Sequence, residues 1–428
     1  MKITYITHAC LLIEIQGIKI LTDPWLKGPS WGGSLWHYPT HNYTIKKIPK
    51  PDYIFFSHGH DDHFHEETIK AFPKSWLSTK ILVANFKEKW WAEAVNSKFS
   101  NVKYLDHNET YSLNDNTKLQ LFINDRGEPD CSIRIFNKKN NIFFQTDNLM
   151  SFKEAKRIGK IQKIDMAFVI PFLTGVFPGF YKWDTETLIS LGKQKLNQSL
   201  DYCFKMITNL KPKYVVPYAC DLGYLGEKFH INLIHTHNKK DLKEKLIKKK
   251  SKIKTIIMGS EDYLKINGSI KFSISRKDEN EFEKLIRFAN EIGPLQKKYL
   301  EEERKIKNPN LNNLVSIFKK NLDRNIKFAD SFNFKTLISI NEEDKNKKIL
   351  IDFKKKKINQ VITNYNKYNP NLILNIESSK VRNLLLKKYP MNFLTFHNGG
   401  YTCERSTMKL TKNEQKYWNW INNLDFFI

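Results

Sequence analysis

The sequence predicts a mixed α/β protein in two parts. First, short runs of β-forming residues such as Tyr53–Phe56 and Lys80–Ala84 alternate with helical segments over residues 1–275. Second, from about Asp278 apolar residues recur every three to four positions, and alternating strands and a short helix follow. We therefore expect a larger α/β domain over residues 1–275 and a smaller C-terminal α+β domain over residues 276–428.

Composition indicates a globular protein. The chain has 428 residues, of which 40% are hydrophobic and 13% aromatic, so it can bury a full core. No apolar run approaches the roughly 18 residues that span a bilayer, and the N-terminus leads straight into a strand. The five cysteines are scattered without a C-x-x-C pair, which argues against a disulfide framework. We expect a soluble cytoplasmic protein with no membrane span.

The formal net charge of +26 could indicate nucleic-acid binding, because Lys and Arg neutralise phosphates. The excess is almost all lysine, and runs such as Lys248–Lys250 and Lys354–Lys357 lie in segments typical of solvated helix faces or turns. We therefore do not expect a nucleic-acid partner. Attraction of a small anionic substrate fits the charge better.

The N-terminal segment Lys2–Trp25 alternates as two strands joined by a hairpin turn at Gln16-Gly17, and Asp23 closes the second strand. The following loop, Trp31–Pro39, combines glycines with large aromatic residues. Exposed aromatic residues require a partner, so this loop either packs over a neighbouring domain or forms the wall of a ligand pocket.

A histidine-rich segment, Ser57–His65, follows the buried strand Tyr53–Phe56 and precedes a helix that begins at Glu66. It contains the pattern H-x-H-x-D-H, formed by His58, His60, Asp62 and His63. A strand-to-helix turn can direct several imidazoles to one point, and neutral imidazole with carboxylate is the ligand set of Zn, Fe or Mn. The segment predicts a metal site.

Further strands are expected at Ser132–Phe136, Ile142–Asp147 and Lys213–Ala219, a helix at Thr185–Asn209, and a final strand and turn at Ile256–Asp262. Asp147 ends its strand. A carboxylate in that position can complete one metal site or span two metals, although an ordinary turn aspartate is the alternative.

The H-x-H-x-D-H pattern resembles the metal-binding motif of the metallo-β-lactamase superfamily, and the opening segment Thr7–Trp25 resembles the hairpin of its lactonase-like branch. This resemblance implies an αββα sandwich for residues 1–275, with Asp147 as the bridging aspartate. The segments Glu128–Ile133, Phe177–Tyr181 and Val215–Cys220 are similar to the catalytic portion of CMP-N-acetylneuraminate hydroxylases and their relatives.

Two departures from these families matter. The hydroxylases receive electrons through a Rieske domain, and this chain lacks its Cys and His ligand pairs. A two-metal hydrolase of the superfamily would carry a further histidine before Ser132, where only Asp125, Glu128 and Asp130 occur. A last histidine near the end of the sandwich is not evident either; the nearest are His230, His235 and His237.

Our leading hypothesis is a hydrolase that uses one or two divalent Zn or Fe ions and acts on an anionic ester, lactone or sugar-phosphate. The resemblance implies that His58 and His60 hold the first metal, with Asp125 or Asp130 as third ligand. Asp62 and His63 would take part in a second site, bridged by Asp147. Asp62 and His63 are the catalytic candidates, because Asp62 could orient a metal-activated water.

Two alternatives remain open. Two histidines with one carboxylate are also the ligand type of non-haem Fe(II) oxygenases. Such an enzyme would need a separate electron-transfer protein, because this chain has no Rieske ligands. A non-catalytic binding protein on the same scaffold is the third hypothesis.

The substrate pocket should be formed by loops at the metal-bearing edge, here Trp31–Pro39 and Thr174–Asp184. We expect Trp36 and Tyr181 to stack on a ring of the substrate and Lys182 to contact a phosphate, as a nucleotide sugar would require. Near the C-terminus, Asn398-Gly399-Gly400 predicts a hairpin turn.

Overall fold

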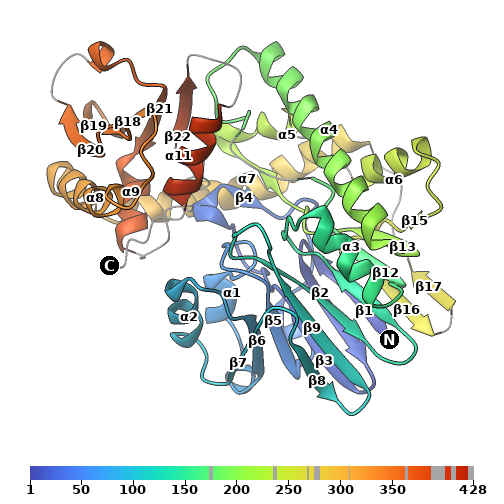
Figure 1. The fold of residues 1–428 in the computed structure, drawn as a ribbon. Helices are drawn as coiled ribbons and strands as arrows, with labels where there is room; N and C mark the ends of the chain where they lie inside the picture. The colour runs from blue at the N-terminus through green and yellow to red at the C-terminus, as the bar shows by residue number, and fades with distance from the viewer. Residues whose placement is uncertain are drawn as a thin grey trace.

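The computed structural model describes residues 1–172, 177–234, 239–267, 269–273, 280–307, 309–361, 365–386, 401–405 and 411–422. It contains two packed sheets flanked by helices, and a third, C-terminal sheet with its own helices (Figure 1). The mixed α/β class and the presence of a sandwich plus a C-terminal unit are confirmed. The expected hairpin turn at Asn398–Gly400 lies outside the described residues.

The first sheet has eight strands. In spatial order they are β17 (Ser269–Ser273), β16 (Tyr263–Asn267), β1 (Lys2–Thr7), β2 (Cys10–Ile15), β3 (Ile18–Thr22), β5 (Tyr53–Phe56), β6 (Lys80–Ala84) and β7 (Val102–Leu105). Strands β3, β5, β6 and β7 are parallel to one another, whereas β1, β2 and β3 are antiparallel neighbours. Strands β1, β3 and β5 therefore end at the same edge of the sheet.

The second sheet has seven strands. In order they are β15 (Lys254–Thr255), β13 (Tyr214–Pro217), β12 (Met166–Val169), β11 (Asn141–Phe144), β10 (Cys131–Phe136), β9 (Thr117–Ile123) and β8 (Thr110–Asn114). Apolar side chains of both sheets, such as Ile13, Phe55, Ile133 and Phe168, form one buried cluster between them. This is the central core of the sandwich.

Helices cover the outer faces of both sheets, which completes the αββα layering (Figure 1). Helices α1 (Glu66–Lys70) and α2 (Lys89–Asn96) pack on the first sheet through Ile69 and Trp91. On the second sheet lie α3 (Phe152–Ile161), α4 (Thr185–Leu210) and α6 (Lys239–Lys248). Their buried faces follow the helical periodicity of the sequence.

The N-terminal segment forms three strands, so the expectation of two was wrong. The predicted turn at Gln16-Gly17 joins β2 to β3, but the chain also reverses between Thr7 and Cys10, which pair with each other. His8 adopts a left-handed backbone conformation there, with φ of 47°. A tight turn at a non-glycine residue of this kind carries no composition signal.

The end of the sandwich also differs from expectation. Residues 256–262 were predicted as the last strand and its turn; the turn lies at residues 260–261, but none of these residues is in a strand, because β15 covers only Lys254–Thr255. The chain then crosses to the other sheet, where β16 pairs with β1 and β17 pairs with β16. Apolar content alone did not distinguish a buried connection from a strand.

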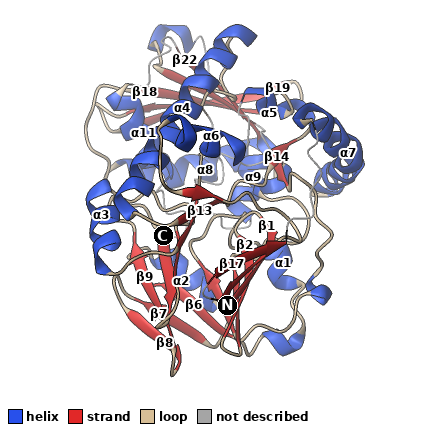
Figure 2. Cartoon of the chain, turned by 90° about the vertical axis from the view of Figure 1, so that its right-hand side faces the viewer, coloured by secondary structure: helices blue, strands red, loops and turns tan. Residues whose placement is uncertain are grey.

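The C-terminal unit is a five-stranded sheet in the order β20 (Lys357–Val361), β19 (Lys345–Asp352), β18 (Lys335–Glu342), β21 (Leu372–Glu377) and β22 (Tyr401–Arg405). Its helices are α7 (Glu281–Lys305), α8 (Leu311–Ile326), α9 (Ser378–Leu386) and α11 (Lys412–Asn422). Figure 2 shows this unit above the sandwich. A short ribbon, β4 (Leu35–Trp36) with β14 (Gly223–Tyr224), lies between them, beside α5 (Ile231–Ile234).

The core of the C-terminal unit includes residues of the sandwich. Trp25, Trp31, Phe180, Tyr181 and Tyr224 belong to the same buried cluster as α8 and the C-terminal strands. The C-terminal unit therefore packs directly on the loops at one edge of the sandwich. Among the described residues, no helix combines the length and apolar composition needed to cross a membrane.

Candidate metal centre

The histidine segment has the predicted strand–turn–helix context. Strand β5 ends at Phe56, and α1 begins at Glu66 with His65 as its N-cap, whose Nδ1 accepts a hydrogen bond from the backbone N–H of Thr68 at 3.2 Å. The other ring nitrogen of His65 lies 3.0 Å from the carbonyl oxygen of Pro29. His65 is thus occupied in holding the turn, which leaves the other histidines of the segment for chemistry.

Three side chains from two strand ends converge at this edge. His58 and His63 come from the turn after β5, and Asp147 follows β11 in the second sheet; one ligand atom of each lies within 4.8 Å of the others. The Nε2 atom of His63 is 3.4 Å from Oδ1 of Asp147. The first sheet therefore supplies two imidazoles and the second sheet a carboxylate to one location.

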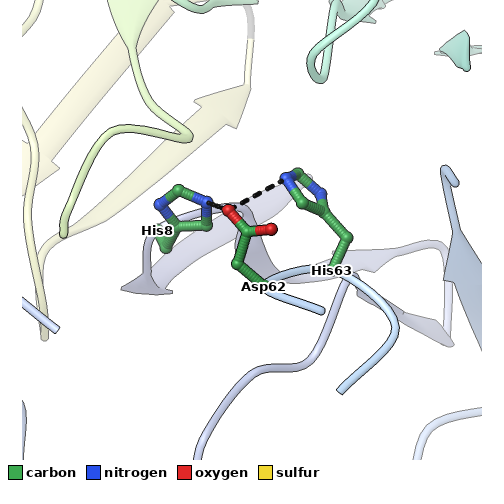
Figure 3. Close-up of side chains that lie close together, drawn as sticks. All are labelled: His8, Asp62 and His63. Carbon is green, nitrogen blue, oxygen red and sulfur yellow. Dashed lines mark ion pairs between the residues drawn. The ribbon is translucent and has the colours of Figure 1, made fainter. Parts of the chain in front are cut away.

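A second group shares His63 and adds His8 and Asp62 (Figure 3). Nε2 of His8 lies 3.3 Å from Oδ2 of Asp62, and Nε2 of His63 lies 4.0 Å from the same oxygen. The other oxygen of Asp62 accepts a hydrogen bond from Nε1 of Trp31 at 2.9 Å. Because both groups use His63, they describe a single centre.

Contacts at the Nδ1 atoms hold the rings of His58 and His63 in place. Nδ1 of His63 lies 3.0 Å from Oδ2 of Asp23, and that carboxylate also accepts hydrogen bonds from the backbone and hydroxyl of Ser57. Nδ1 of His58 lies 2.9 Å from Oγ of Ser57 and 3.5 Å from Oδ1 of Asp130. Contacts at Nδ1 select the tautomer and leave Nε2 directed into the centre, as outer partners do in metal sites.

The residues present fit a divalent metal. Nε2 of His58, Nε2 of His63 and Oδ1 of Asp147 are buried and have no hydrogen-bond partner among the described residues. Buried polar atoms are normally paired, so three converging exceptions require an explanation. Two ligands about 2.1 Å from one tetrahedral ion lie about 3.4 Å apart, which matches the 3.3 and 3.4 Å separations in the two groups.

The electrostatics prepare His58 for metal binding, whereas His63 would have to lose a proton to the solvent when a metal binds. Burial, together with the charges of His63, His60 and His8, lowers the pKa of His58 well below its usual value, so the ring is neutral and can bind a metal. Burial would lower the pKa of His63 too, but Asp147 and Asp23 outweigh it and raise that pKa well above its usual value. Burial with the neighbouring charge of Asp147 raises the pKa of the Asp130 carboxyl.

The structure brings together most, but not all, of the predicted ligands. His58, Asp62, His63 and Asp147 occur in the two groups, whereas Asp130 contacts the outer nitrogen of His58. The His60 ring lies 4.3 Å from that of His58 and 5.1 Å from Trp31, outside both groups, and its role as a ligand stays a prediction. Asp125 instead accepts hydrogen bonds from Ser151 at the start of α3. His235 and His237 lie outside the described residues, and Nε2 of His230 lies 3.2 Å from the carbonyl oxygen of Gly179.

Sequence reasoning missed His8 and Asp23. Both directly follow strands, β1 and β3, whose ends lie at the edge where β5 delivers the histidine turn. The sequence offered one signal for them: each of three strands that end at this edge is followed directly by a polar residue. It could not be used for His8, because the first strand was not expected to end at Thr7.

The predicted substrate residues are in contact with other parts of the protein. Trp36 is buried against Leu225 and Phe288. The hydroxyl of Tyr181 donates a hydrogen bond to Glu414 at 2.9 Å, and Lys182 forms an ion pair with Glu404 at 2.7 Å. Both partners belong to the C-terminal unit, so these contacts hold the two units together, and a role in substrate binding stays a prediction.

Comparisons with known proteins find similarity that is concentrated in the sandwich. Residues 2–150 match the model of the Beta-lactamase superfamily domain. The chain is 24% identical over 269 residues to the cytidine monophosphate-N-acetylneuraminic acid hydroxylase of Gorilla gorilla gorilla, covering 59% of this chain and 43% of that protein. It is 24% identical over 320 residues to the hydroxylase of Asterias rubens, covering 68% and 47%. The chain thus spans less than half the length of these relatives.

A solved structure with a similar fold is the isothiocyanate hydrolase from Delia radicum gut bacteria. It is 14% identical, with a TM-score of 0.45, and the match covers 62% of this chain and 99% of that one. Residues 2–150 are thus similar to the Beta-lactamase superfamily domain, and 59% of the chain is similar, at 24% identity, to a cytidine monophosphate-N-acetylneuraminic acid hydroxylase.

Proposed function

We propose that this protein is a metal-dependent hydrolase of an anionic ester, lactone or sugar-phosphate substrate. The observation that carries the proposal is the convergence of the unpartnered atoms of His58, His63 and Asp147 on one buried location. Imidazole and carboxylate there would hold Zn or Fe. A bound metal of this kind lowers the pKa of its water to about 7 and polarises the bond to be cleaved.

The chain's own groups would position the reactants. Burial opposes ionisation of Asp62, but the hydrogen bond to His8 and the charge of His63 outweigh it and lower the pKa of Asp62, so it is a carboxylate at neutral pH. Trp31 fixes one oxygen of Asp62 by a hydrogen bond, and the other oxygen faces His8 and His63. This second oxygen can orient a water molecule for attack.

The preference for an anionic substrate rests on charge. The chain carries 71 Lys and Arg against 45 Asp and Glu, which favours the approach of anions over cations. A nucleotide sugar, as bound by the proteins named hydroxylases above, is one member of this class. The contacts of Tyr181 and Lys182 with the C-terminal unit give that narrower choice no separate support.

An iron-dependent oxygenase is the second candidate. Both ligand groups contain two histidines and one carboxylate, the set typical of non-haem Fe(II) oxygenases, and the similar curated proteins are named hydroxylases. This function would need electrons from a separate electron-transfer protein.

The test begins with elemental analysis of the full-length protein purified without chelators. Zinc-loaded protein should then hydrolyse members of a panel of anionic esters, lactones and phosphodiesters under anaerobic conditions. Asp62→Asn should lower that rate by about 100-fold or more, whereas Asp115→Asn, in an exposed turn, should leave it unchanged. Oxygen consumption by the iron form with a reductase, without hydrolysis by the zinc form, would replace the hydrolase proposal by the oxygenase. Protein that retains less than one metal equivalent would contradict both.

A further inference from the structure

A cavity of about 300 Å³ lies between the sandwich and the C-terminal unit. Its walls come from four parts of the chain that are far apart in the sequence: Ser34 before β4; Leu225, Gly226 and Lys228 after β14; the second half of α7 with Ile306; and Glu377 with the first turns of α9. In Figure 1, α7 passes between the two units beside β4. None of the metal-centre residues lines this cavity. Its volume is at the lower end of the range found for small-molecule sites.

The lining is rich in positive charge. Its four basic residues are Lys228, Arg304, Lys380 and Arg382, and its two acidic residues are Glu303 and Glu377. Lys228, Lys380 and Arg382 are only 8%, 4% and 1% exposed. Of the acidic pair, Glu377 has a side chain that is 59% exposed, so Glu303 is the one buried carboxylate of the lining. An anion in the cavity would be surrounded by positive groups.

Contacts with the cavity wall hold these basic groups in position. Nζ of Lys380 lies 3.3 Å from Oε2 of Glu303, and Nη1 of Arg382 donates a hydrogen bond to the carbonyl oxygen of Ile306 at 2.6 Å. Nζ of Lys228 lies 4.9 Å from the centroid of the Phe180 ring. Charged side chains fixed in this way lose little freedom when a ligand binds, which favours affinity.

The backbone adds to the same potential. Helix α9 spans Ser378–Leu386, and Ser379 and Lys380 of its first turn line the cavity. The N-terminal end of a helix carries a partial positive charge and N–H groups without helical partners, which stabilise anions. The N-terminus of α9 therefore adds to the positive side-chain charge, whereas the last turn of α7, which also lines the cavity, presents the opposite end of a helix dipole.

We propose that this cavity is a second ligand site, which binds a small molecule through a phosphate or carboxylate group. One segment of the chain contacts both the cavity and the metal centre. Ser34 follows the turn Trp31–Gly33 directly, and Trp31 donates its indole N–H to Asp62. A ligand there joins α7 and α9 to the turn that orients this carboxylate.

Titration of the full-length protein with inorganic phosphate, and separately with succinate, followed by calorimetry, tests the proposal. Arg304→Gln should weaken binding by about tenfold, because Arg304 lines the cavity from an exposed position where its replacement spares the fold. Lys305→Gln is the matched control: Lys305 is the next residue of the same helix, pairs with Glu302 at 2.6 Å and does not line the cavity.

Binding of phosphate alone, of succinate alone or of both supports the site and distinguishes a phosphoryl from a carboxylate ligand. Binding should also persist after a chelator has removed any metal, because the metal centre shares no lining residue with the cavity. No measurable binding of either anion at about 10 mM, equal binding by the Arg304→Gln and Lys305→Gln proteins, or loss of binding with the metal would each overturn the proposal.

Discussion

Two buried clusters of polar and charged residues differ in how their charged groups are neutralised. In the candidate metal centre, His58, His63 and Asp147 direct atoms without hydrogen-bond partners at one another. The second cluster, which we call the Arg405 cluster, consists of Arg405, Glu414, Phe177, Tyr181 and Trp183. Its two charged residues form an ion pair, with Nη1 of Arg405 2.9 Å from Oε2 of Glu414.

The aromatic rings of the Arg405 cluster lie against the guanidinium, whose Nε and Nη2 have no hydrogen-bond partner among the described residues. The guanidinium of Arg405 lies 5.1, 4.4 and 5.2 Å from the ring centroids of Phe177, Tyr181 and Trp183, and Tyr181 donates its hydroxyl hydrogen to Glu414. Similar residue types thus serve a different purpose: a balanced ion pair with stacked rings stabilises the contact between two units, whereas convergent unpaired atoms indicate a ligand. Both clusters thus contain buried atoms without hydrogen-bond partners, but only in the first do imidazole and carboxylate atoms converge on one location, and composition does not show this.

The largest expected effect follows removal of a convergent atom. His58→Ala and His63→Ala should each lower metal affinity by more than about 100-fold, beyond the effect typical of outer partners, because each substitution removes an Nε2 that faces the centre. Metal content after equilibrium dialysis measures this. His107→Ala is the control, because the partly exposed ring of His107 contacts Glu154 and neither residue belongs to the two ligand groups. Full metal retention by the His58 and His63 variants would refute the assignment.

In the Arg405 cluster, substitution should affect stability and not metal content. Glu414→Gln leaves the buried guanidinium of Arg405 without its counter-charge and should lower the free energy of unfolding by about 3–5 kcal/mol. Lys182→Ala, which breaks the exposed pair with Glu404, should cost at most about 1 kcal/mol. Denaturant unfolding with parallel metal analysis distinguishes the clusters. Metal loss from folded Glu414→Gln protein would show that the clusters are coupled.

A smaller effect is expected for residues that contact the outer nitrogens of the proposed metal ligands. Asp23→Asn keeps the shape of the side chain but weakens its interaction with Nδ1 of His63, so metal affinity should fall about 10- to 100-fold. Asp52→Asn, at an exposed carboxylate that accepts a backbone N–H from Lys19, should leave affinity unchanged. Metal competition with a chromogenic chelator provides the measurement. Equal affinities of the two variants would remove Asp23 from the centre.

The smallest effect concerns Asp241, whose Oδ2 has no hydrogen-bond partner in the described part of the chain but which belongs to neither metal group. Burial and the charges of Glu244 and Glu281 raise the pKa of Asp241 to about 6. A carboxyl with a raised folded-state pKa destabilises the fold when it ionises, and this penalty is absent below the unfolded pKa of about 3.9 and complete above about 6.

Asp241→Asn should therefore stabilise the protein by about 1 kcal/mol at pH 7–8 after allowance for solvent screening, and the gain should vanish near pH 4. Unfolding free energies at both pH values test the sign. Metal content should not change, because an unpartnered carboxylate oxygen indicates a metal only where imidazoles converge on it. A loss of bound metal would contradict the comparison.

The sequence by itself determined the fold class, the H-x-H-x-D-H turn between β5 and α1, and the position of Asp147 after a strand, because these depend on local periodicity and spacing. The tertiary structure alone decided which polar groups meet. It placed His8 beside Asp62 and His63, and Asp23 beside Nδ1 of His63. It also placed Asp130 beside Nδ1 of His58, and Tyr181 beside Glu414. The physical reason is that pairing of buried charges depends on contacts between residues far apart in the chain, here up to 233 positions for Tyr181 and Glu414, and no local pattern records them.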